Sequence, residues 1–85
     1  MPSVILTSTF KVEFFELSEN EQKQARKAIR LLSENPKYSS LRMHRVQGTD
    51  YWEIYVNKDI RIIFEQNSDM FVLHLIGHHD ILKKY

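Results

Sequence analysis

The chain has 85 residues, of which 42% are hydrophobic and 12% aromatic, and no cysteine. This composition predicts one globular domain and excludes disulfide scaffolds and cysteine-based zinc sites. The formal net charge is +1, and residues 37–62 hold five basic against three acidic side chains, a smaller excess than a dedicated nucleic-acid-binding protein usually carries.

The segments that direct or anchor proteins to membranes are not recognisable in this sequence. The beginning, MPSVILTSTF, lacks both the basic leader and the long apolar region of a secretory signal peptide. No apolar run approaches the roughly 20 residues that cross a bilayer. With two glycines, two prolines and no internal repeat, we expect a single cytoplasmic domain over residues 1–85.

The first half of the chain predicts a short strand and two helices. Residues 4–6 favour an opening strand, and the apolar residues Phe10, Phe14 and Leu17 have the spacing of a first helix. Ser18 and Glu21 form a capping-box pattern that begins a second helix. The apolar face of that helix is Ala25, Ala28, Ile29 and Leu32, and Pro36 ends it.

The second half predicts four strands. We expect the first over LRMHRVQG, residues 41–48. In YWEIYVN, residues 51–57, apolar side chains alternate with polar and tyrosine side chains, so one face suits a core and the other an open surface. NKD, residues 57–59, predicts a tight turn into IRIIFE, and the apolar MFVLHLIG, residues 70–77, predicts a central strand. The expected fold is α+β, with two helices packed on one face of a four- to five-stranded, mainly antiparallel sheet.

Arg61 stands between two isoleucines in a strand that the pattern predicts to be buried. A buried arginine must find a partner or reach water. It could form a structural ion pair with Glu53 or Asp59, or extend into solvent. Alternatively its guanidinium could face a phosphate on the open side of the sheet.

The histidines near the end of the chain each have a structural interpretation. His74, between Leu73 and Leu75, is predicted to be a hydrogen-bonded core histidine, and His78 to be exposed at a strand end. Asp80 after His79 could begin a short helix over DILKK. We do not expect His78, His79 and Asp80 to bind a metal, because neighbouring residues of a strand point to opposite faces.

In this order, the segments ENP, LRMHRVQG, YWEIYVNKDIRIIF and VLHLIGHHD resemble the RelE/ParE superfamily of small bacterial toxins from type II toxin–antitoxin pairs. The resemblance covers nearly the whole chain and is greatest to the YafQ-type ribonucleases. It implies a RelE-like fold, similar to that of the microbial ribonucleases. It also implies a cognate antitoxin as partner, with which the chain would form a hetero-oligomer.

The resemblance also implies a set of site residues. His44, Asp59 and His79 match the histidine and acidic positions of the YafQ type, and Arg61 matches the phosphate-stabilising arginine of RelE- and YoeB-type members. Tyr85 matches a late catalytic tyrosine. The side chains expected to contact substrate are Arg45, Glu53, Tyr55, Lys58 and His78.

The activity implied by the resemblance is cleavage of mRNA without a metal or other cofactor. The ribose 2′-OH attacks the adjacent phosphate, and the reaction needs a proton acceptor, a proton donor and positive charge near the transition state. We expect His79 as general acid, Arg61 as the charge, and His44 or Asp59 as base or as the group that orients the 2′-OH. Because the chain is only weakly basic, we expect cleavage on the ribosome. The alternatives are a ParE-type inhibitor of DNA gyrase without enzymatic activity, or a member that has lost catalysis.

Overall fold

The predicted order of one strand, two helices and four strands is confirmed in the computed structural model, which describes residues 3–79. The elements are β1 (Ser3–Leu6), α1 (Ser8–Phe15), α2 (Glu19–Glu34), the 3-10 helix η1 (Ser39–Leu41), β2 (His44–Arg45), β3 (Trp52–Tyr55), β4 (Ile60–Asn67) and β5 (Met70–His78). The helix expected over DILKK and the residue Tyr85 lie outside the described residues.

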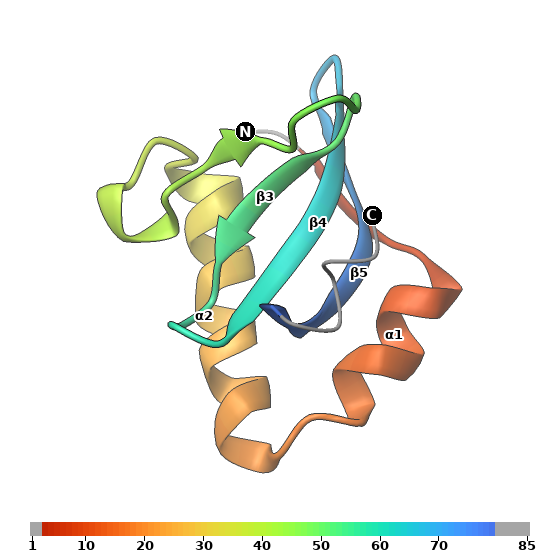
Figure 1. Cartoon of the computed structure of the whole chain (residues 1–85), viewed down its shortest axis with the longest axis vertical. Coiled ribbons are helices and arrows are strands. Elements are labelled where there is room, and N and C mark those ends of the chain that lie inside the picture. Colours follow the sequence, from red (N-terminus) through yellow and green to blue (C-terminus); the bar gives the residue numbers. More distant parts are fainter. Residues whose placement is uncertain (1–2, 80–85) are drawn as a thin grey trace.

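The five strands form one mixed sheet in the order β1-β5-β4-β3-β2 (Figure 1). β1 runs parallel to β5, and the other three pairings are antiparallel. β5 therefore has a neighbour on each side, as its apolar sequence predicted. The fold is α+β, and the predicted class is confirmed.

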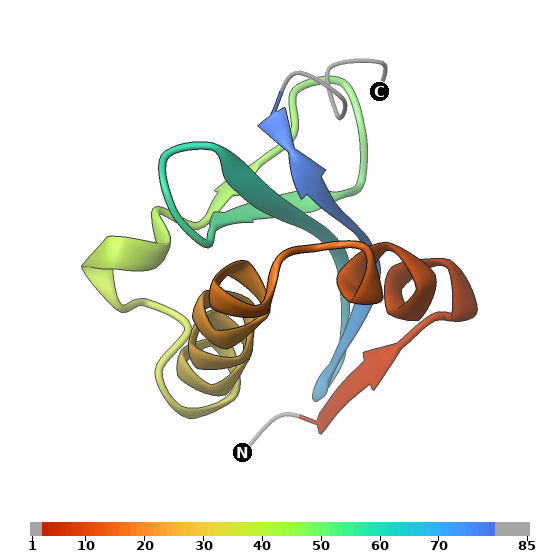
Figure 2. The ribbon, with the colours of Figure 1, turned by 90° about the horizontal axis from the view of Figure 1, so that it is seen from below.

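The two helices are joined by residues 16–18 and lie on the same side of the sheet (Figure 2). The predicted capping box begins α2: Glu21 N–H donates to the Ser18 hydroxyl, and Ser18 N–H donates to the Glu21 carboxylate. That backbone donor holds the pKa of Glu21 below its ordinary value. Within residues 3–79, neither helix is long and apolar enough to cross a membrane.

One hydrophobic core joins both helices to a single face of the sheet. Along β4, Ile60, Ile62 and Phe64 face the helices, because alternate residues of a strand share a face. The rest of the buried cluster is Phe10, Ala25, Ala28, Leu32, Leu41, Ile54, Phe71, Leu73 and Ile76. The opposite face of the sheet is thereby left for polar side chains.

The strand expected over residues 41–48 is much shorter than predicted. Only His44 and Arg45 pair with β3, and Leu41 instead ends η1 with its side chain buried in the core. Arg42, which follows, has a left-handed backbone with φ of 47°, a conformation that is uncommon outside glycine. The chain thus turns at Arg42 before it can pair, because the core holds Leu41.

The prediction that His74 belongs to the core is wrong. Ile63 pairs with Leu75 and Phe64 with Leu73, so His74 is the extra residue of a β-bulge and has no partner across the ladder. Its side chain is 31% exposed, and its Nε2 atom lies 3.1 Å from Glu65 Oε1. The predicted hydrogen bond is present, but on the open face.

Glu13 of α1 closes the edge of β5 where β1 has ended. The Ile76 N–H donates to the Glu13 carboxylate over 3.1 Å, so a side chain takes the place of a neighbouring strand. Burial raises the pKa of Glu13 above its ordinary value of 4.5, although the Ile76 hydrogen bond opposes this.

We expect Glu13→Gln to increase stability at neutral pH, because the amide oxygen still accepts from Ile76 without placing a charge in a partly buried site. A raised acid pKa means that Glu13 contributes most below its ordinary value of 4.5 and that this contribution falls as pH rises through the raised pKa. The gain over wild type should therefore disappear in acid. Glu13→Ala, which leaves the Ile76 N–H without its acceptor, should instead cost about 1–2 kcal/mol. Urea unfolding across pH measures both, and equal stabilities of the two variants would contradict this role.

Candidate functional site

The open face of the sheet gathers polar residues from three neighbouring strands. The register pairs His44 of β2 with Glu53 of β3, and Tyr55 of β3 with Arg61 of β4. Arg61 in turn pairs with Gly77 of β5, a residue without a side chain. Because these pairs are neighbours on one pleated surface, their side chains lie together. We call His44, Glu53, Tyr55 and Arg61 the open-face cluster.

Arg61 does not extend into solvent. It is 6% exposed, and its guanidinium carbon lies 3.6 Å from the centroid of the Tyr55 ring, which is close cation–π contact. Its Nη1 donates to the carbonyl oxygens of Asn57 at 2.7 Å and Lys58 at 2.8 Å. These two hydrogen bonds therefore fix the turn between β3 and β4.

The remaining side of the guanidinium faces Glu53. Arg61 Nε lies 4.0 Å from Glu53 Oε1, which is ion-pair distance but too long for a hydrogen bond. Nε is buried and has no hydrogen-bond partner. A buried donor without an acceptor is costly and uncommon, so this atom marks a place where an added oxygen would be favourable.

Glu53 is shared between Arg61 and His44. His44 Nε2 lies 3.0 Å from Glu53 Oε1, while its Nδ1 lies 2.8 Å from the carbonyl oxygen of Arg42. A carbonyl only accepts, so Nδ1 must carry a hydrogen. A hydrogen bond to the carboxylate then needs a second hydrogen on Nε2 or one on Glu53. The His44–Glu53 pair therefore brings together two groups that can each donate or accept a proton.

The turn between β3 and β4 brings two more predicted residues close to the cluster. The Asn57 side chain accepts from the backbone N–H groups of Asp59 and Ile60, which fixes an Asx-type turn. The His79 N–H donates to the Asp59 carbonyl over 2.6 Å. Asp59 and His79 are thus adjacent beside the turn that Arg61 supports, and both side chains are exposed.

The structure separates three other predicted residues from the cluster. His78 Nε2 lies 3.8 Å from Glu21 Oε2 at the start of α2, so His78 turns to the helical side of the sheet. Arg45 lies over the Trp52 ring at 5.9 Å and pairs with the exposed Asp50. Lys58 contributes its backbone carbonyl to Arg61, and its side chain is exposed.

Sequence reasoning missed one cation, and it predicted the turn at residues 57–59 without singling out Asn57. Arg42 entered only as part of the predicted strand, yet its guanidinium carbon lies 5.5 Å from the Tyr55 ring centroid. Asn57 organises the turn and also donates to Gln24 of α2 over 2.7 Å. The asparagine at the start of NKD was a usable signal, because Asn side chains commonly close such turns. Nothing local predicted the contact of Arg42.

Metal-binding geometry is not found in the part of the chain that the structure describes. Between residues 3 and 79, no three histidine, aspartate or glutamate side chains are grouped as a metal ion requires. The open-face cluster instead combines one carboxylate with one arginine, one tyrosine and one histidine. Such a group can attract an anion and move a proton.

A family model described as the ParE-like toxin domain matches residues 19–83. A search of curated proteins found no significant match.

Solved toxin structures have the same fold over almost their whole length. In the E. coli DinJ–YafQ toxin–antitoxin complex, the similar chain has 15% sequence identity and a TM-score of 0.81, with 96% of this chain and 97% of that chain covered. For the RelB–RelE antitoxin–toxin complex from Methanococcus jannaschii the identity is 18% and the TM-score 0.73, with 95% and 96% covered. The YoeB/ParE toxin from Agrobacterium tumefaciens has 12% identity and a TM-score of 0.74, with 91% and 98% covered.

We expect Arg61→Ala to lower the free energy of unfolding by about 2–3 kcal/mol, because hydrogen bonds from a charged donor to the turn carbonyls are lost. The matched control is Arg45→Ala, whose side chain is 60% exposed and which should change stability by less than about 0.5 kcal/mol. Urea unfolding measures both. Equal, small losses would show that Arg61 does not support the turn.

Proposed function

Since the chain belongs to the family of ParE-like toxin domains and has the RelE/ParE fold of type II toxin–antitoxin systems, we propose that it is an endoribonuclease that cleaves mRNA. The observation that carries this proposal is the 3.0 Å contact between His44 Nε2 and Glu53 Oε1, next to the buried charge of Arg61. RNA cleavage by 2′-OH attack needs these two functions at one place: proton exchange, and positive charge where the phosphate gains negative charge.

The first step assigned to this site is activation of the 2′-OH. The 2′-oxygen transfers its proton to Glu53 Oε1 and attacks the neighbouring phosphorus. His44, bonded to the same oxygen and fixed by the Arg42 carbonyl, orients the carboxylate and supplies charge when it is doubly protonated. This refines the expectation that His44 itself is the base, because both of its ring nitrogens already face acceptors.

The second step is departure of the 5′-oxygen. The bond between phosphorus and the 5′-oxygen breaks, and that oxygen takes a proton from His79, which leaves a 2′,3′-cyclic phosphate and a 5′-OH. Support for His79 comes from the hydrogen bond that its backbone N–H donates to the Asp59 carbonyl. This bond holds His79 beside the turn that Arg61 supports. The histidine imidazole can donate a proton near neutral pH. In this mechanism Asp59 positions His79, and Lys58 and Tyr55 contact the RNA strand on either side of the cleaved phosphate.

The role proposed for Arg61 is electrostatic. Its Nη1 is occupied by the turn and its guanidinium face by Tyr55. The charge lies in a place where water cannot screen it, so it would act strongly on a phosphate above Glu53. A phosphoryl oxygen that displaced Glu53 slightly would give Nε the acceptor that it lacks.

A second candidate function is inhibition of DNA gyrase, which the match to the ParE-like family model favours. That activity requires no proton transfer, so the His44–Glu53 pair would then serve stability alone. In both candidates a cognate antitoxin would bind the chain and form a hetero-oligomer with it, as antitoxins do in the DinJ–YafQ and RelB–RelE complexes.

We expect Glu53→Gln to reduce mRNA cleavage by about 10²- to 10⁴-fold, because the variant loses the proton acceptor. The chain contains a matched control in Glu65→Gln, since Glu65 also lies beside a histidine, His74, but away from Arg61. This control should cleave at the wild-type rate. EDTA should leave both rates unchanged. Wild-type cleavage by Glu53→Gln, with an unchanged unfolding midpoint, would transfer the role of base to Asp59.

We expect the purified chain to cut mRNA on programmed ribosomes much faster than the same transcript free in solution. Its charge excess is too small to hold naked RNA well, and a ribosome can supply the orientation of the reacting groups, worth on the order of 7–11 kcal/mol in favourable cases. The measurement is a side-by-side digestion, with a gyrase supercoiling assay run on the same preparation. Equal rates would refute ribosome dependence. No cleavage together with inhibited supercoiling would establish the second candidate.

A further inference from the structure

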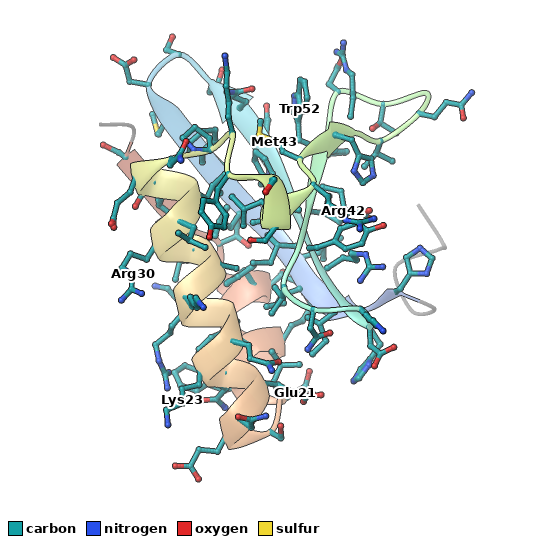
Figure 3. The ribbon with its side chains drawn as sticks, turned by 90° about the vertical axis from the view of Figure 1, so that its left-hand side faces the viewer. Glu21, Lys23, Arg30, Arg42, Met43 and Trp52 are labelled. Carbon is teal, nitrogen blue, oxygen red and sulfur yellow. The ribbon has the colours of Figure 1, made fainter. Side chains whose placement is uncertain are left out.

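A cavity of about 540 Å³ lies at the end of the sheet opposite the turn that Arg61 supports. Its apolar lining comes from Tyr38, Met43 and Trp52, and polar groups are supplied by Lys37, Arg42 and Gln66. In Figure 3, Arg42, Met43 and Trp52 lie together beside η1. We call this the Trp52 cavity.

The chemistry of the Trp52 cavity suits a flat, anionic ligand. Trp52 is half-buried and packs against the core, while Tyr38 is 46% exposed. Aromatic rings of this kind stack on nucleobases of any sequence. The lining includes two cations and no acidic side chain, which favours an anionic group such as a phosphate. Gln66 can both donate to and accept from the edge of a base.

Arg42 connects the cavity with the open-face cluster. It lines the Trp52 cavity, and its guanidinium also approaches the Tyr55 ring that Arg61 covers. Trp52 faces the helical side of β3 and Glu53 the open side, so a ligand that reaches both must pass around the edge of the sheet. That edge is short, because β2 pairs through only two residues and the chain turns away at Arg42.

We propose that the Trp52 cavity binds one base of a single-stranded RNA, next to the phosphate that the open-face cluster cleaves. The base stacks on Trp52 in place of the exposed Arg45 side chain, whose guanidinium carbon lies 5.9 Å from the ring centroid in this structure. It also contacts Gln66, and Arg42 with Lys37 neutralises the phosphate on the connecting stretch. The left-handed backbone of Arg42 holds its side chain at the sheet edge, a strain of the kind that proteins keep at ligand sites. The assignment rests on the proposed ribonuclease function for the identity of its ligand.

The test uses the fact that Trp52 is the only tryptophan in the chain. Wild-type protein is titrated with a short adenosine oligonucleotide whose 2′-OH groups are methylated, so that it cannot be cleaved. We expect saturable quenching of Trp52 fluorescence in step with the anisotropy of a labelled copy of the oligomer. Inorganic polyphosphate, which has the charge without the bases, should leave the fluorescence unchanged.

Variants on the cavity surface sharpen the test without removing the tryptophan. Gln66→Ala, which loses a hydrogen bond to the base, should raise the dissociation constant about 2- to 10-fold, and Arg42→Ala should raise it and weaken its salt dependence. The control Lys23→Ala removes a cation from α2 (Figure 3) and should change neither.

Three outcomes would overturn the assignment: no change of either signal, binding seen by anisotropy without quenching, or equal quenching by polyphosphate. Prevention of quenching by a bound antitoxin would support a shared surface. The result is separable from the proposed function. Quenching without any mRNA cleavage would leave the base site standing and refute the ribonuclease, whereas cleavage without quenching would do the reverse.

Discussion

Burial of the Arg61 guanidinium is the constraint around which the open face of this protein is built. A guanidinium cannot shed its proton, so one that is 6% exposed must be neutralised where it lies. Here the turn carbonyls, the Tyr55 ring and Glu53 each supply part of the compensation. The position of the turn follows from this requirement, because its carbonyls must point inward to Arg61. Gly77, opposite Arg61 in the ladder, places no side chain beside it.

The hydrogen bonding of the Arg61 guanidinium is incomplete, and the proposed function uses the atom that is left over. Nε has no hydrogen-bond partner, and Glu53 is drawn at once toward Arg61 and toward His44. A fully satisfied ion pair would be inert. In the proposed mechanism, a carboxylate that contacts a histidine and a buried arginine is already in place for an anionic substrate, which is how enzymes avoid reorganisation costs. The atoms that stabilise the turn are thus the same atoms to which the proposed function assigns the chemistry.

The shortness of β2 links the two candidate surfaces. If residues 41–48 paired fully with β3, the sheet edge would be long, and the side chains on its two faces would be kept apart. Leu41 prevents this because its side chain is buried in the core. The chain then changes direction at Arg42, whose backbone is left-handed. The result is an edge that one side chain can span. Arg42 stands at that edge, near Tyr55 on one side and the Trp52 cavity on the other.

Local sequence patterns determined the order of the elements, the capping box at Ser18, the turn at residues 57–59 and the face on which Glu53, Tyr55 and Arg61 lie. Each depends on residues close together in the chain, whose periodicity and capping chemistry are visible without a fold. Only the tertiary structure decided that His44 meets Glu53, that Arg45 turns to Trp52 and that His78 turns to Glu21. It also decided the bulge at His74. These contacts depend on the register between strands that are distant in sequence, and one extra residue in a ladder changes which side chains meet.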